Sequence, residues 1–217
     1  MKILKKFSFN PIACRKELND LRVHLDSRIC LEERKDVLPF FKEREHLSAF
    51  IGSYFPYIAG FDRLAFEYDI FGDFKADVVV GDSASGWYCF AEFEGAHTTS
   101  IFEKRPGKTT PEWGSDFEHG FSQIVDWFWK LSVLENTREF LIKFGHEYAG
   151  YEGILIIGRT EGLEQRERDR LRWRRDKILI NSKHIHCVTF DELYSHLDMR
   201  LRSYEAAFLI DREDVSG

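Results

Sequence analysis

The chain has 217 residues, of which 43% are hydrophobic and 15% aromatic, enough for the packed core of one large domain or two small ones. Its net charge of −6 argues against a nonspecific coat on nucleic acid but leaves room for a local basic face. The four cysteines form no CxxC pair and no apolar run reaches about 18 residues. We therefore expect a cytoplasmic protein with reduced thiols and no membrane-spanning helix.

The N-terminal part of the chain has the pattern of helices. Residues 14–36 carry a mixed-charge helical pattern, and residues 41–55 carry an apolar stripe at helical spacing that ends at Pro56. No repeat and no linker rich in proline or glycine divides the chain. We expect an N-terminal helical arm over residues 1–38 and one domain over residues 39–217.

The rest of the chain alternates between strand and helix patterns. Strands are predicted over 63–71, 74–80, 87–94, 153–158 and 184–190, and helices from Ser115, over 163–177 and from Asp191. Ser115 and Glu118 have the spacing of a capping box. This order predicts an α/β fold with a mixed central sheet flanked by helices.

The predicted hairpin between the second and third strands brings three carboxylates together. A four-residue loop would place Asp82 opposite Trp87, and therefore Asp77 opposite Glu92, with Glu94 on the same face as Glu92. Opposed like charges repel unless a cation lies between them, and a set of carboxylates suits Mg²⁺ or Mn²⁺. We expect these three acids to be metal ligands. A strand glutamate that simply faces solvent is the alternative, and a register slip of one residue would separate the acids.

The helix that begins at Ser115 has a polar stripe opposite its apolar side. The stripe contains His119, Gln123, Asp126 and Lys130. A solvated helix face would explain the stripe, but Trp127 and Trp129 beside it favour the floor of a crevice.

Taken together, these segments resemble a known family. The stretches "ADVVVGD", "YCFAEFEGA", "SIFEK", "FEHGFSQIVDWFWKL", "GILIIGR" and "VTFDEL", within residues 40–200, resemble the nuclease domain of the Shedu antiviral-defence family. That domain belongs to the PD-(D/E)XK phosphodiesterase superfamily. The resemblance implies a restriction-endonuclease-like core with a mixed sheet flanked by helices.

The resemblance also implies roles for individual residues. Asp77 matches the first metal-binding acid of the superfamily, Glu92 the second, and Gln123 the glutamine on the helix beside the site. Glu94 occupies the position where most members have lysine, so Lys130 or Lys104 would have to supply the missing cation.

Superfamily sites often include one more acid from the first helix. Glu43 and Glu45 are the candidates in "KEREHLSAF", and helical spacing favours Glu43 because it lies four residues before Leu47. The alternative is that both are solvated helix residues.

Basic residues outside the acid cluster are candidates for binding nucleic acid. The segment 166–177 has seven basic and three acidic residues, and the predicted loop over 103–113 lies beside the acids. The candidates are Lys104, Arg105, Lys108, His119, Arg170 and Arg174. Ion pairs within the helix are an equally good explanation of its charges.

The function implied by the resemblance is a Mg²⁺- or Mn²⁺-dependent DNA endonuclease of antiviral defence, acting as a homo-oligomer. One alternative is a nuclease-fold module that binds DNA or regulates a partner, with catalysis lost or dependent on that partner. A hydrolase acting on another phosphoester, such as a nucleotide, is the third possibility.

Overall fold

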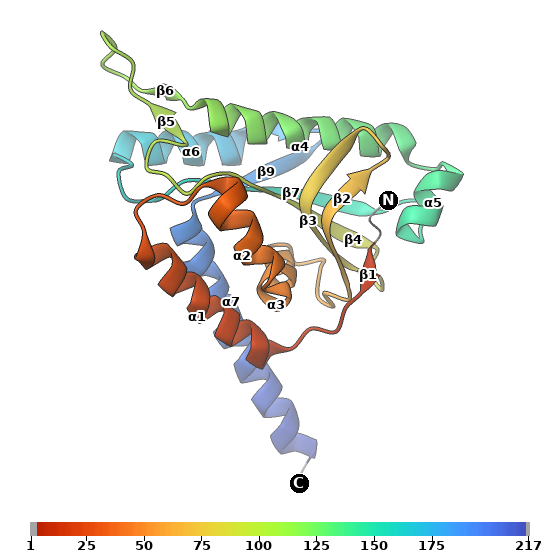
Figure 1. Ribbon diagram of the computed structural model, residues 1–217. Helices are drawn as coiled ribbons and strands as arrows, with labels where there is room; N and C mark the ends of the chain where they lie inside the picture. The colour runs from red at the N-terminus through yellow and green to blue at the C-terminus, as the bar shows by residue number, and fades with distance from the viewer. Residues whose placement is uncertain (1–3, 216–217) are drawn as a thin grey trace.

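The computed structural model describes the backbone of residues 4–215 and the side chains of residues 4–207. A seven-stranded mixed sheet lies between two layers of helices (Figure 1). The strands, in spatial order, are β1 (Lys5–Lys6), β2 (Arg63–Ile70), β3 (Phe74–Asp82), β4 (Trp87–Phe93), β7 (Gly150–Ile156), β9 (Lys183–Val188) and β8 (Leu179–Ile180). β4, β7 and β9 run parallel, and the remaining neighbours are antiparallel. The predicted α/β fold with a mixed sheet is confirmed.

The helices cover both faces of the sheet. One face carries α1 (Pro11–Ser27), α2 (Leu38–Lys42), α3 (Glu45–Phe50) and α7 (Phe190–Val215). The other carries α4 (Ser115–Leu134), α5 (Arg138–Phe144) and α6 (Gln165–Lys177). A separate small hairpin of β5 (Phe102–Glu103) and β6 (Glu112–Trp113) projects from the body near the start of α4 (Figure 1).

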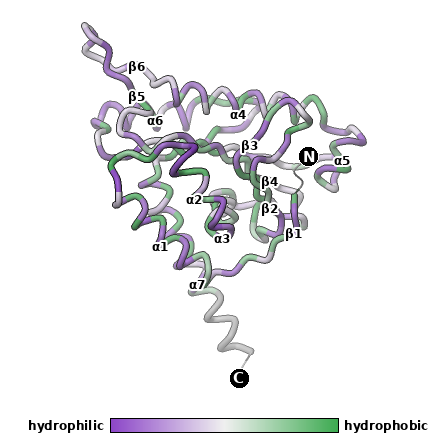
Figure 2. Tube along the Cα trace, viewed as in Figure 1, coloured by the Kyte–Doolittle hydropathy of each residue, from purple (hydrophilic) through white to green (hydrophobic). Residues whose placement is uncertain are grey.

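Burial explains why these segments pack as they do. Ile154, Leu155 and Ile156 of β7 are fully buried, as expected for a central strand that is covered on both faces. Figure 2 shows hydrophobic residues concentrated in the sheet, whereas the projecting β5–β6 segment is mainly hydrophilic. The buried sheet is therefore the rigid framework that positions the polar site.

The N-terminal helices differ from the sequence prediction. The expected helix over residues 14–36 ends at Ser27, and a short π-helical segment, η1 (Glu33–Val37), follows an extended stretch. The chain is extended there because Leu31 forms an antiparallel bridge with Ala96. The expected helix over residues 41–55 is likewise divided into α2, α3 and the 3₁₀ turn η2 (Ile51–Tyr54).

One prediction about α4 was wrong. Gly114, rather than Ser115, is the N-cap residue, and Ser115 donates hydrogen bonds from its backbone nitrogen and hydroxyl to Glu103. Two residues of the predicted polar stripe do line a cavity, but the tryptophans beside it do not: Trp127 is fully buried in the core and Trp129 is 58% exposed. The indole of Trp127 packs in the apolar cluster that α4 forms with the sheet.

The N-terminal helix is part of the core. Its Cys14, Leu18, Leu21 and Leu25 side chains are buried in one apolar cluster with residues of β3, β4 and α7. All four cysteines of the chain are free thiols. None of the helices in the described part of the chain combines the length and the apolarity that crossing a membrane requires.

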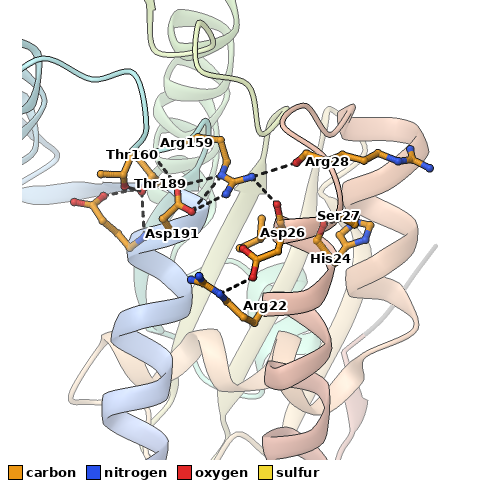
Figure 3. Close-up of polar contacts among 11 residues, drawn as sticks. Arg22, His24, Asp26, Ser27, Arg28, Arg159, Thr160, Thr189 and Asp191 are labelled. Atoms are coloured by element: carbon orange, nitrogen blue, oxygen red, sulfur yellow. Dashed lines mark hydrogen bonds and ion pairs between the residues drawn. The ribbon is translucent and has the colours of Figure 1, made fainter.

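A half-buried arginine joins α1, the segment after β7 and α7. The guanidinium of Arg159 contacts both carboxylate oxygens of Asp191, at 3.0–3.2 Å. It also donates to the backbone oxygens of Leu25, at 2.9 Å, and Arg28, at 3.5 Å (Figure 3). Charge-assisted bonds of this kind are about twice as strong as neutral ones. Arg159 therefore fixes the path of the chain just before Leu31 and Glu33.

Candidate active site

The hairpin of β3 and β4 has the predicted register. Asp82 lies opposite Trp87, and the pairing continues without interruption to Val78 opposite Ala91. The next position along the ladder places Asp77 opposite Glu92, and the charge of Asp77 acts directly on the Glu92 carboxyl group.

Asp77 and Glu92 are held in place by further contacts. The Oδ2 atom of Asp77 accepts a hydrogen bond of 2.9 Å from the backbone nitrogen of Phe93. The Oε1 atom of Glu92 accepts one of 2.6 Å from Nε2 of Gln123 on α4. Its Oε2 atom is buried and has no hydrogen-bond partner among the described residues. Glu92, at 6% exposure, thus presents one unpaired oxygen to the site.

Glu94 lies on the same side, just beyond the end of β4. It is 5% exposed, and its carboxyl group lies close to that of Glu33. A Cβ atom at Gly120 of α4 would lie 3.1 Å from Cγ and Oε1 of Glu94 and 2.6 Å from Cδ1 of Leu155. Glycine at position 120 therefore allows α4 to approach the acids closely.

Burial and mutual repulsion keep these acids protonated. Burial raises the pKa of Asp77 and that of Glu92, and the charges of the neighbouring acids raise the pKa of Glu92 further. Burial, followed by the charge of Glu33, raises the pKa of Glu94 to about 8. The protein thus holds neutral carboxyl groups where an exposed cluster would be ionised at neutral pH.

Glu33 is the residue that the sequence analysis missed. It begins η1, and it reaches Glu94 because the Leu31–Ala96 bridge joins their two segments. It was assigned to a continuous helix, so no pattern in the sequence singled it out. The structure brings Glu33, and not Glu43, to the acids.

Three of these acids, Glu33, Asp77 and Glu92, line a cavity of about 490 Å³. Four segments line it: η1 with α2, the adjacent strands β2 and β3, the end of β4, and the first half of α4. The lining residues are Glu33, Arg34, Leu38, Pro39, Lys42, Glu67, Lys75, Asp77, Glu92, His119 and Gln123. Of the predicted site residues, Asp77, Glu92, Gln123 and His119 are thus brought together.

The backbone is strained at the edge of this cavity. Glu67 has a φ of 49°, in the left-handed region, and the ladder between β2 and β3 skips the position where Glu67 would pair with Asp77. Non-glycine residues in this region cost about 1–2 kcal/mol and cluster at functional sites. Glu67 forms an ion pair of 3.2 Å with Lys42, another residue of the cavity wall.

The remaining predicted catalytic residues lie elsewhere. Glu43 is exposed where α2 ends, with its carboxylate 3.7 Å from Arg44. Lys130 forms an ion pair with Asp73 in the β2–β3 turn, and Lys104 pairs with Glu164 at 3.3 Å. The lysines that line the cavity are instead Lys42 and Lys75. Alternation along β3 already places Lys75 on the same face as Asp77.

The predicted nucleic-acid contacts are engaged within the protein. Arg105 and Lys108 both pair with Glu112 of β6. Arg174 forms a two-pronged ion pair with Glu118, at 2.6 and 2.8 Å. Arg170 donates a 2.7 Å hydrogen bond to the backbone oxygen of Pro111.

The acids form two neighbouring pairs, Asp77 with Glu92 and Glu33 with Glu94. Within residues 4–207, no three histidine, cysteine, aspartate or glutamate side chains are placed to coordinate one metal ion. The unpaired Oε2 atom of Glu92 and the acid-rich donor set are nevertheless of the kind that hard divalent cations prefer.

The fold and the site define an α/β protein with a cluster of buried carboxyl groups at the end of a β-hairpin, capped by a glutamine from a neighbouring helix. The family model described as "Shedu protein SduA, C-terminal" matches residues 31–194, so the chain belongs to this family. The matched region begins two residues before Glu33 and includes all four acids and Gln123. A search of curated proteins found no match.

Proposed function

We propose that the chain is a metal-dependent DNA endonuclease with a PD-(D/E)XK-type core. One observation carries the proposal: the carboxyl groups of Glu33, Asp77 and Glu92 line one cavity, with Glu94 beside Glu33, and an oxygen of Glu92 has no hydrogen-bond partner among the described residues. Burying like charges and an unpaired polar atom costs several kcal/mol, which stability alone does not justify. A site that receives a cation accounts for both features.

Asp77 and Glu92 are the residues that would hold Mg²⁺ or Mn²⁺, with Glu94 and Glu33 beside them. A bound divalent ion would lower the pKa of a water molecule and neutralise charge on a phosphodiester. Gln123 orients Glu92 through its hydrogen bond, so that Oε2 is directed away from the helix. Asp77 is oriented in the same way by the backbone of Phe93.

The cavity also offers cations for a phosphate group. Lys42 and Lys75 line its wall. They are the candidates for the role that a lysine at position 94 has in most of the superfamily. Glu33 takes the place proposed for Glu43, and neither Lys130 nor Lys104 is needed for this role.

A second candidate function is a DNA-binding or regulatory module that has lost turnover or depends on a partner. Glu94 in the lysine position favours it, because an additional buried acid opposes the approach of a phosphate. The family membership supports a role in antiviral defence under either function. We further propose that the protein acts in the cytoplasm as a homo-oligomer, and a monomeric mass by light scattering would contradict the second part.

Cleavage of plasmid and linear DNA tests the proposal. The wild type is compared with Asp77→Asn and Glu92→Gln in Mg²⁺, in Mn²⁺ and in EDTA. Both substitutions preserve shape while removing a ligand charge, so we expect cleavage to fall by at least about 100-fold. Glu161→Gln, at an exposed glutamate outside the cavity, is the matched control.

Thermal unfolding of each variant shows that the fold is intact. Metal-dependent cleavage that survives in both variants would overturn the assignment of the ligands. If the wild type cuts neither substrate but binds DNA, the second function is the correct one.

A further inference from the structure

α6 is the most basic element of the chain. Its thirteen residues, Gln165–Lys177, include seven arginines or lysines and three acids, a charge of +4 in a chain of net charge −6. Arg166 and Arg172 on this helix are exposed. A local excess of positive charge of this kind attracts the phosphate backbone of a nucleic acid.

A cleft with aromatic walls lies against this helix. It has a volume of about 260 Å³ and is lined by Trp113, Arg170, Trp173, Arg174 and Ile178. The side chain of Trp173 is 61% exposed. What distinguishes Trp173 from the other exposed aromatic residues is its place in a cleft beside two arginines and a second indole.

The arginines of the cleft are held rigidly. The guanidinium of Arg174 lies 4.7 Å from the ring centre of Trp113 and is fixed by its two bonds to Glu118. Its Nε atom is buried and has no hydrogen-bond partner among the described residues. The guanidinium of Arg170 lies 5.2 Å from the same ring and is fixed by Pro111. The cleft is therefore formed in advance, with little side-chain ordering left for a ligand to impose.

The cleft and the acid cavity are connected through α4. Glu118, which holds Arg174, is followed in the chain by His119, which lines the acid cavity. The β5–β6 segment joins the cleft region, because Lys104 pairs with Glu164 at the start of α6.

We propose that the cleft binds an unpaired nucleobase, stacked on the indole of Trp173, in DNA whose backbone lies along α6. Every nucleobase has a flat face that stacks on an aromatic ring, and arginine planes add a cation–π contribution. Bases inside an intact duplex are stacked on one another and cannot enter the cleft. The preferred ligand is therefore a single-stranded segment, such as a frayed end or a gap. The inference rests on the proposed interaction with DNA but not on catalysis.

Binding of oligonucleotides in EDTA tests the inference without catalysis. The probes are a fluorescent oligothymidylate and the same backbone with abasic residues in place of thymidine, measured by anisotropy at low salt. Stacking of one base is expected to make the wild type bind the thymidylate about 5- to 150-fold more tightly than the abasic strand. Trp173→Ala should lose this difference while retaining the weaker, salt-dependent binding of the abasic strand.

Trp129→Ala is the matched control, because Trp129 is 58% exposed but does not line the cleft. It should bind both probes as the wild type does. Equal affinity of the wild type for both probes, an unchanged preference in Trp173→Ala, or no binding of either strand would overturn the inference. If the protein prefers the thymidylate probe but cuts no DNA, the cleft proposal stands and the nuclease proposal is refuted. If it cuts DNA but binds both probes equally, the nuclease proposal stands and the cleft proposal is refuted.

Discussion

Glu94 provides a test of the buried acid cluster that does not depend on cleavage. Its folded-state pKa is raised to about 8, from a value near 4.5 in the unfolded chain. A raised carboxyl pKa means that the folded state binds the proton more tightly. Stability is therefore fully present below about pH 4.5 and is lost as the pH rises through about 8.

The size of this effect follows from the shift. Each pKa unit corresponds to 1.36 kcal/mol, so the full shift of Glu94 would amount to about 5 kcal/mol. Part of the shift comes from the charges of neighbouring acids, and solvent screening weakens that part, which leaves roughly 2–3 kcal/mol for Glu94. For a chain of this length, that is a fall in Tm of roughly 4–12 °C.

The assay is thermal and urea unfolding in EDTA from pH 5 to pH 8. Glu94→Gln replaces a neutral acid with a neutral isostere, so we expect this variant to match the wild type at pH 5 and to be more stable at pH 8. Glu161→Gln, at an exposed site, should follow the wild-type profile. Mn²⁺ at pH 8 should restore the stability of the wild type more than that of Glu94→Gln. Parallel pH profiles for the wild type and Glu94→Gln would refute the reasoning.

Two further substitutions test how the site is supported. Gly120→Ala places a Cβ atom 2.6 Å from Leu155 and 3.1 Å from Glu94. We expect the free energy of unfolding in urea to fall by about 1–3 kcal/mol, and Mn²⁺ to bind more weakly by calorimetry. An unchanged Mn²⁺ affinity would contradict the close approach of α4 to Glu94. Arg159→Lys keeps the charge but loses the two-pronged contact with Asp191. We expect the free energy of unfolding in urea to fall by about 2–4 kcal/mol. A variant as stable as the wild type would show that this arginine does not fix the chain before Leu31.

The sequence predicted the half of the site that local geometry determines. A short hairpin loop fixes the register of its strands, so Asp77 and Glu92 could be placed opposite each other before the structure was known. Helical periodicity placed Gln123 on the face that meets them. Both inferences depend on residues that are close together in the chain or on one regular element.

The other half depends on contacts between distant segments. Glu33 reaches the cluster through the bridge of Leu31 with Ala96 and through a π-helical turn, for which the 3.6-residue period does not apply. Glu43 appeared to face the core because the helix was assumed to continue, whereas α2 ends at Lys42. Residue spacing in a single sequence reveals neither the bridge between Leu31 and Ala96 nor the end of α2 at Lys42.

The bridge between Leu31 and Ala96 also has a consequence for biosynthesis. It joins two stretches separated by about sixty residues, and Glu33 and Glu94 meet only after that junction has closed. During translation Glu33 emerges from the ribosome long before β4, and an unfinished chain therefore holds one acid of the set and nothing to pair it with. Assembly of the complete cluster is thus a late event, which requires the junction of Leu31 with Ala96 to have closed.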